Sequence, residues 1–87
     1  QAIIDLTVEE LNQTLGLYPN PVQTFVRLTL LHPMNVEVYD ASGKLLIVGF
    51  YGPGMHTLDC SSWPAGVYYV HGLSDQTRIV RPFIKSE

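Results

Sequence analysis

The sequence of 87 residues has little of what metal-binding, membrane-spanning and nucleic-acid-binding proteins need. Its one cysteine, Cys60, excludes an internal disulfide and any zinc site built from several cysteines. Lysine and arginine number five against eight acidic residues, giving a net charge of −3. Because neutralising phosphates supplies most nucleic-acid affinity, we expect no nucleic-acid partner. No apolar run approaches the roughly 18 residues of a transmembrane helix.

Groups that could carry catalysis are also few. His32, His56 and His71 fall one to each of three separate segments, so a three-histidine metal site is not expected. Cys60 has no histidine or lysine beside it, which is typical of a buried and inert thiol. Asp59 has no neighbouring group to act with. We therefore expect no enzyme activity, no catalytic residue, no metal and no cofactor.

Apolar residues are plentiful by contrast. They make up 46% of the chain, while charged residues make up only 15%, so one domain with a compact core is predicted. Short segments of strand character follow one another between turns. They are Thr24–Leu31, Asn35–Asp40, Lys44–Phe50, Met55–Cys60, Val67–Leu73 and Thr77–Ile84. Strands at this spacing without intervening helices indicate an all-β sandwich or barrel of six strands, or seven if the N-terminal segment supplies one.

Turn residues divide these segments. Asp40-Ala-Ser-Gly43 is a turn signal, because Asp40 can bond to its own downstream backbone and Gly43 can take a positive φ. It predicts a hairpin between the segments on either side. Gly49 and the glycines and proline of 52–54 predict a loop around Tyr51. Pro82 has no N–H to donate, which predicts an edge position or a bulge for the last strand.

The first 16 residues are read as a linker or N-terminal extension. Apolar residues recur there at helical spacing, with Gly16 as a candidate C-terminal cap, which favours a helical turn within Val8–Leu15. A strand over Ala2–Val8 followed by a linker is the competing interpretation.

Charge is distributed unevenly along the chain. The first 16 residues carry three acidic residues and no base, whereas the last 12 carry Arg78, Arg81 and Lys85 against Glu87. Such ends are commonly just solvated surface. The functional alternative is a basic terminal strand that a partner recognises.

Aromatic residues allow a second functional class. Five tyrosines and Trp63 could form a stacking surface for sugars, as in a carbohydrate- or surface-binding module appended to an enzyme. However, Tyr68 and Tyr69 must point to opposite sides of one strand, so we expect Tyr68 in the core beside Val70 and Tyr69 on the surface.

Four segments together carry a more specific signal. They are Leu17-Tyr-Pro-Asn-Pro21, Val36-Glu-Val-Tyr-Asp-Ala-Ser-Gly-Lys-Leu45, Leu58-Asp-Cys-Ser-Ser-Trp-Pro-Ala-Gly-Val-Tyr-Tyr-Val70 and the basic tail Arg78-Ile-Val-Arg-Pro-Phe-Ile-Lys85. In this order, over residues 17–87, they resemble the type A C-terminal sorting domain of type IX secretion cargo proteins of the Bacteroidota. The motif residues are Tyr18, Pro19, Asn20, Pro21, Asp40, Gly43, Gly66 and Tyr68. Cys60, where the family usually has an aliphatic residue, and Pro82, inside the last strand, depart from the family pattern.

The resemblance implies both fold and function. The fold expected is an all-β, immunoglobulin-like antiparallel β-sandwich of about seven strands. The function expected is a secretion signal that directs an attached passenger from the periplasm across the outer membrane to the cell surface or medium. The partners implied are the outer-membrane translocon, shuttle proteins and a surface sortase that cuts in or before residues 1–16.

Two hypotheses concern the terminal strand. In the first, Arg78, Arg81 and Lys85, together with backbone pairing, are read by the machinery. In the second, the strand is exchanged between two copies in a homodimer.

Overall fold

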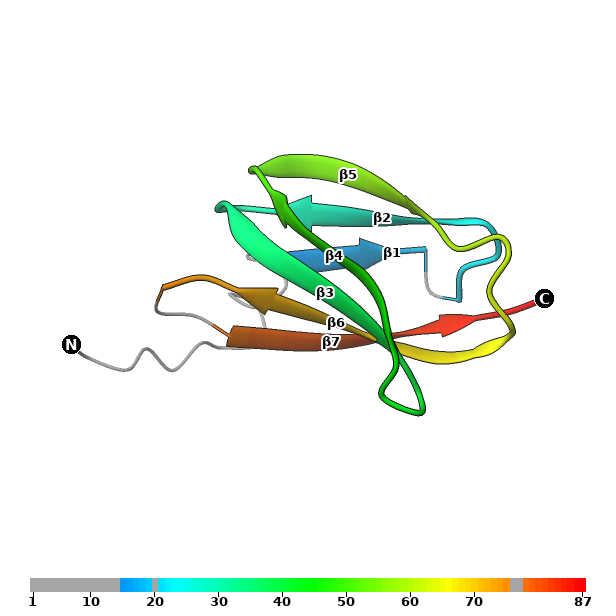
Figure 1. Ribbon diagram of the computed structural model, residues 1–87. Coiled ribbons are helices and arrows are strands. Elements are labelled where there is room, and N and C mark those ends of the chain that lie inside the picture. Colours follow the sequence, from blue (N-terminus) through cyan, green and yellow to red (C-terminus); the bar gives the residue numbers. More distant parts are fainter. Residues whose placement is uncertain (1–14, 20, 76–77) are drawn as a thin grey trace.

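A computed structural model describes residues 15–19, 21–75 and 78–87 as a sandwich of two antiparallel sheets (Figure 1). The strands are β1 (Leu15–Tyr18), β2 (Phe25–Leu30), β3 (Met34–Asp40), β4 (Leu45–Tyr51), β5 (Gly54–Asp59), β6 (Gly66–Leu73) and β7 (Arg78–Lys85). One sheet has the order β1-β2-β5 and the other β4-β3-β6-β7. The predicted all-β sandwich of about seven strands is therefore confirmed. Among the described residues, no helix has the length and apolar character of a membrane span.

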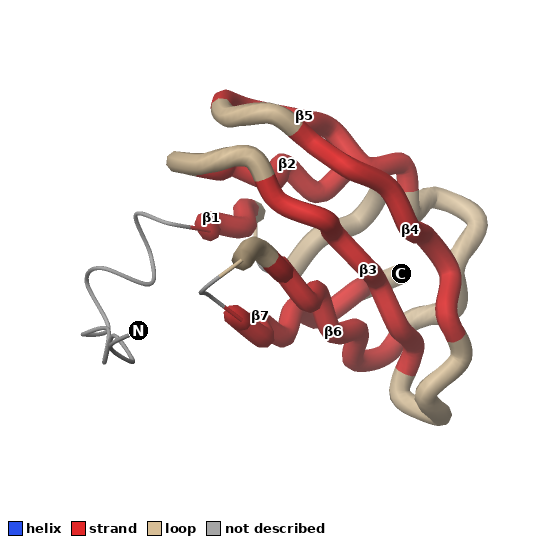
Figure 2. Tube along the Cα trace, turned by 60° about the vertical axis from the view of Figure 1, so that its left-hand side comes forward, coloured by secondary structure: helices blue, strands red, loops and turns tan. Residues whose placement is uncertain are grey.

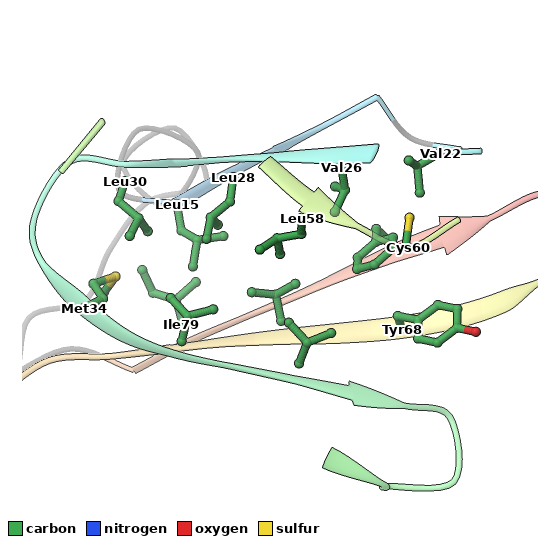
Figure 3. Packing of buried hydrophobic residues seen from close by; sticks show 14 residues of the cluster. Leu15, Val22, Val26, Leu28, Leu30, Met34, Leu58, Cys60, Tyr68 and Ile79 are labelled. Carbon is green, nitrogen blue, oxygen red and sulfur yellow. The ribbon is translucent and has the colours of Figure 1, made fainter. Parts of the chain in front are cut away.

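The core fills the space between the two sheets (Figure 3). Alternation along β2 places Val26, Leu28 and Leu30 on the inner face, as the sequence pattern predicts, and all three are buried. The opposite sheet contributes alternate residues of β3, β6 and β7. Tyr68 and Val70 are among them, whereas Tyr69 is exposed, which confirms the expected division of the two tyrosines.

The hairpin predicted around Asp40–Gly43 is confirmed. β3 and β4 pair antiparallel from Met34 opposite Tyr51 to Tyr39 opposite Leu45, with one irregularity between Val38 and Tyr39.

The loop predicted around Tyr51 is wrong in extent. β4 runs through Gly49 to Tyr51, so only residues 52 and 53 separate it from β5. The reason is packing within the strand, because a Cβ at Gly49 would lie 3.3 Å from the ring of Tyr51. Gly49 thus makes room for a neighbouring ring in the strand and does not end it.

The N-terminal segment does supply an additional strand, β1, which begins at Leu15. Leu15 and Gly16 pair with Leu30 and Thr29 of β2, so the predicted helical pattern does not extend to Leu15, and Gly16 is not a helix cap. Pairing with β2 and full burial of Leu15 override the local helical spacing. The remaining part of that prediction, and the competing strand over Ala2–Val8, lie outside the described residues.

β7 is an edge strand, as Pro82 predicts. It lies beside β1 of the other sheet, so β1 and β7 flank one open side of the sandwich (Figure 2).

Candidate functional site

Asp40, Gly43, Gly66 and Tyr68 of the motif lie at one end of the sandwich, which we call the motif end. It is formed by the β3–β4 turn, the β5–β6 connection, the β1–β2 connection and the last residues of β7, because Asp40 lies opposite Tyr68 and Gly66 lies opposite Lys85 in the sheet register. A groove of about 400 Å³ opens there, between the turn and the connection. Asp40, Gly66 and Tyr68 line it together with Trp63. Segments more than 20 residues apart in sequence thus form one surface.

The β3–β4 turn is closed by its own side chain. The Asp40 carboxylate accepts hydrogen bonds from the Ser42 amide (2.9 Å), the Ser42 hydroxyl (2.6 Å) and the Lys44 amide (2.9 Å). The Ser42 hydroxyl bond is the main reason that the pKa of Asp40 lies below its ordinary value. Gly43 has a φ of 89°, a conformation that side chains resist, so the predicted turn chemistry is confirmed.

A matching turn follows β5, as the turn residues of Ser61–Gly66 predict, but the sequence analysis missed the role of Asp59 in closing it. Asp59 accepts hydrogen bonds from the Ser61 amide (2.9 Å) and hydroxyl (2.7 Å), which lower its pKa. The signal was present, because Asp59-Cys-Ser61 repeats the Asp-x-Ser spacing of Asp40-Ala-Ser42.

Tyr68 fastens the β5–β6 connection to the core. Its hydroxyl donates a hydrogen bond to the carbonyl of Pro64, four residues earlier. Its ring packs against both Trp63 and Phe83, with centroid distances of 5.0 Å and 5.5 Å, and those two rings also contact each other at 6.4 Å. Burial raises the pKa of the phenol. Gly66 adopts a φ of 156° where the chain turns into β6, so the Pro-Ala-Gly-Val-Tyr segment is a corner held by its tyrosine.

The β1–β2 connection attaches to the end of the chain. Val22 donates its amide to the Ile84 carbonyl (2.8 Å) and accepts from the Ser86 amide (2.8 Å), forming a short parallel bridge with β7. The motif residues Pro19 and Pro21 are exposed beside this bridge. Tyr18 lies on the outer face of the other sheet, where its hydroxyl contacts the Met55 sulfur at 3.1 Å. Asn20 lies outside the described residues.

The three basic residues of β7 have different surroundings. Arg78 is exposed. Arg81 is half-buried, and its guanidinium donates to the Leu15 carbonyl at 2.9 Å, across the open side between β7 and β1. Lys85 is only 5% exposed, and its ammonium bonds to the Ser86 carbonyl at 3.0 Å. The three charges therefore do not form one exposed patch.

The outer edge of β7 is partly blocked. The Ile84 carbonyl faces Val22 and away from β6, and backbone groups alternate along a strand, so the N position of Pro82 faces the same outer edge. Proline supplies no donor there. Within the part of the chain that the structure describes, the stretch of this edge that remains for another strand is therefore the segment around Arg78 and Val80.

In the described part of the chain, the groups associated with catalysis do not assemble into one cluster. Among the described residues, no group of three His, Cys, Asp or Glu side chains could hold a metal ion. His56 bonds to the Gly52 carbonyl at 2.7 Å, and His71 packs on Tyr39. Cys60 is buried, its thiol donates to the Thr24 carbonyl at 3.3 Å, and burial raises its pKa.

The aromatic residues do not form a single platform either. Tyr68 and Trp63 pack together at the motif end, Tyr51 packs on His56 beside the short β4–β5 loop, and Tyr18 lies on the opposite sheet. Tyr39 and Tyr69 lie opposite each other on the outer face of the four-stranded sheet, so these aromatic residues are divided among several surfaces.

A family model described as "Secretion system C-terminal sorting domain" matches residues 16–86, from β1 to the end of β7. No curated protein matches the chain.

Proposed function

The chain belongs to the family of secretion system C-terminal sorting domains, and from this premise we propose how its residues act as a type IX secretion signal for an attached passenger. The observation that carries the proposal is the extent of the family match. It begins at Gly16 in β1 and ends at Ser86, one residue after β7, so it coincides with the whole sandwich and not with a short tail. The signal is accordingly the folded domain.

The part of the domain that the machinery reads is the terminal strand at its open edge. Arg78 is exposed at the start of β7, and the outer edge around Arg78 and Val80 carries neither Pro82 nor the Val22 bridge. A strand of the translocon or of a shuttle protein can pair with such an edge, with a charge on Arg78 to fix the register. Arg81 and Lys85 belong to the same recognised strand, and their bonds to Leu15 and Ser86 hold it in place.

The route and the processing are further parts of the proposal. The domain passes through the periplasm and brings its passenger to the cell surface or medium, where a surface sortase cuts before the sandwich. A cut N-terminal to Leu15 is favoured, because Leu15 is fully buried and accepts the Arg81 bond, so a protease would have to unfold β1 to cut within it.

A transfer experiment tests the sorting function. Residues 1–87 are fused to the C-terminus of a periplasmic reporter in a Bacteroidota host, with and without its type IX machinery. We expect surface display that requires the machinery, and N-terminal sequencing of the released domain then locates the cut. A reporter that stays in the periplasm of the host with intact machinery would refute the sorting function.

Variants of the terminal strand test the recognition step. Deleting Arg81–Glu87 should leave the reporter in the periplasm, but the deletion also removes Phe83 from the core. Arg78→Ala avoids this difficulty, because an exposed side chain is removed and the fold is retained. We expect Arg78→Ala to reduce export with unchanged thermal stability, and Lys44→Ala, an exposed lysine in the β3–β4 turn, to leave export unchanged. Normal export of Arg78→Ala would remove that residue from the recognised surface.

Strand exchange through β7 is a second proposal for this edge. Exchange would replace the Arg81–Leu15 and Val22–Ile84 bonds within one copy by the same bonds between two copies. Light scattering at high concentration tests it, and a chain that remains monomeric would refute it.

A further inference from the structure

The outer face of the four-stranded sheet is unusually apolar. This face consists of the side chains of β4, β3, β6 and β7 that point away from the core. Its exposed large apolar residues are Leu45, Val48, Phe50, Val67, Tyr69, Val80 and Ile84. Val48 and Phe50 are 64% and 69% exposed. A solvated face of an antiparallel sheet normally carries polar residues at these alternate positions. β3, between β4 and β6, presents Asn35, Glu37 and Tyr39 on this face. Exposed apolar residues gathered on one face mark a site of association.

Charge on this face favours a second copy of the chain over a lipid or a highly charged partner. Its charged residues are Glu37 on β3 and Arg78 on β7, one of each sign. The face is therefore neutral overall, so no net charge on it opposes the approach of a second copy. An anionic membrane surface would require several basic residues around the apolar patch.

The size of the face also suits a dimer. Four strands about 4.8 Å apart and some 25 Å long give a plan area of about 500 Å². Protruding side chains raise the accessible area toward the roughly 800 Å² per partner of a standard interface. Pairing along the β4 edge alone would cover a strip about 23 Å long and 10 Å deep, which is far too small.

The face has a hollow at one end and an exposed aromatic ring at the other. At the motif end, a hollow of about 310 Å³ is bounded by Tyr39, Tyr69 and His71 and by the β3–β4 turn. Phe50 protrudes at the opposite end, where it lies opposite Asn35 in the register. A two-fold axis across the strands would turn the second copy end for end. Phe50 of each copy would then lie toward the end at which the other copy has its hollow.

We propose that the outer face of the β4-β3-β6-β7 sheet is the interface of a homodimer in which two sandwiches pack face to face. This inference does not depend on the sorting function. It differs from exchange of β7, because each copy keeps all its strands.

Sedimentation equilibrium of the 87-residue chain, over a range of concentrations at moderate salt, tests the proposal. We expect a reversible monomer–dimer equilibrium. Phe50→Glu should weaken the dimer at least about tenfold, because it would bury a charge in an apolar interface. Phe25→Glu is the matched control, since Phe25 is 50% exposed on the outer face of the other sheet and should leave the equilibrium unchanged. Circular dichroism confirms that both variants fold.

The variant Val80→Glu distinguishes packing through the whole face from pairing along the β4 edge alone. Val80 lies on β7, two strands away from β3 and three from β4. The substitution Val80→Glu therefore weakens the dimer only if the whole face is buried. A chain that stays monomeric at all concentrations overturns the proposal. So does a dimer that resists Phe50→Glu, which indicates strand exchange, and so does one that resists only Val80→Glu, which indicates pairing along β4.

Discussion

At the scale of single residues, the turns and corners of this domain are held by side chains that bond to nearby backbone. Asp40 and Asp59 each close a turn with a serine two residues later, and Tyr68 reaches back to the Pro64 carbonyl. Each bond is local in sequence, so each can be tested by a single substitution beside a near neighbour that lacks it.

Tyr68→Phe removes only the hydroxyl that donates to the Pro64 carbonyl in the β5–β6 connection. We expect a loss of about 1 kcal/mol in the free energy of unfolding, the usual net contribution of one hydrogen bond. Tyr69→Phe is the control, because Tyr69 is on the outer face and no hydrogen bond holds its hydroxyl in the described structure. Urea unfolding of both variants measures the difference. Equal stabilities would mean that the Tyr68 hydroxyl does not hold the corner.

Ser42→Ala should raise the pKa of Asp40 toward its ordinary value of 3.8, because the Ser42 hydroxyl is the largest cause of the lowered pKa. A carboxylate with a lowered pKa stabilises the fold above its ordinary pKa and loses that contribution as the pH falls through the folded value. The wild-type chain should therefore lose part of its stability below about pH 4, and Ser42→Ala should lose less. NMR titration of the Asp40 carboxyl carbon measures the pKa, with Ser62→Ala as the control. An unchanged titration in Ser42→Ala would exclude the serine as the cause.

Gly72→Ala tests packing in the core. A Cβ at Gly72 would lie 2.7 Å from a methyl carbon of Leu15 and 3.1 Å from the Met34 sulfur, and both side chains are buried. We expect a loss of about 1–3 kcal/mol from overpacking. Gly52→Ala, where a Cβ would meet no atom within 4 Å, should change little. Thermal unfolding compares the two, and a Gly72→Ala chain as stable as the control would show that Leu15 and Met34 can move aside.

At the scale of elements, the structure shows which features could be predicted from the sequence. The β3–β4 hairpin and the edge position of β7 were predictable, because Asp40, Gly43 and Pro82 act through their own backbone. β1 was not, because four residues become a strand only by pairing with β2. The extent of β4 was missed since the role of Gly49 depends on the ring of Tyr51.

The candidate site, too, could be predicted from the sequence only in part. Most motif residues could be assigned to turns, but the meeting of Asp40, Gly66 and Tyr68 in one groove with Trp63 depends on tertiary packing. Likewise, a lysine near the end of a chain suggests surface, and only the folded sandwich shows that Lys85 is buried against the β1–β2 connection.

The hydrogen bond from Arg81 of β7 to Leu15 of β1 provides the prediction at this scale. Arg81→Ala removes the guanidinium that donates to the Leu15 carbonyl, so β7 and β1 lose this hydrogen bond. We expect faster hydrogen exchange of β1 amides and a loss of about 1–2 kcal/mol, as for a hydrogen bond to a charged group. Arg78→Ala, on the same strand, should leave both unchanged. Unaltered exchange in Arg81→Ala would show that burial of Leu15 alone holds β1.

At the scale of the whole molecule, the question is whether the sorting signal is a shape or a stretch of sequence. The family match spans β1 to β7, and the motif end joins segments from four parts of the chain. Pairing with β6 on one side holds β7 as a strand, and this leaves its other edge to face outward. A linear signal would need none of these long-range contacts.

Val26→Asp separates the two cases. Val26 is fully buried on β2, in the sheet that does not contain β7, so an unpaired charge there should unfold the domain while leaving the terminal strand intact in sequence. Thr57→Asp is the matched control, because Thr57 is exposed on the neighbouring strand β5, opposite Arg27. If the folded sandwich is the signal, the reporter fused to Val26→Asp stays in the periplasm and the Thr57→Asp fusion reaches the surface. If both fusions reach the surface, although circular dichroism shows the first to be unfolded, the machinery reads the tail as a linear sequence, and the fold serves the domain only outside the translocon.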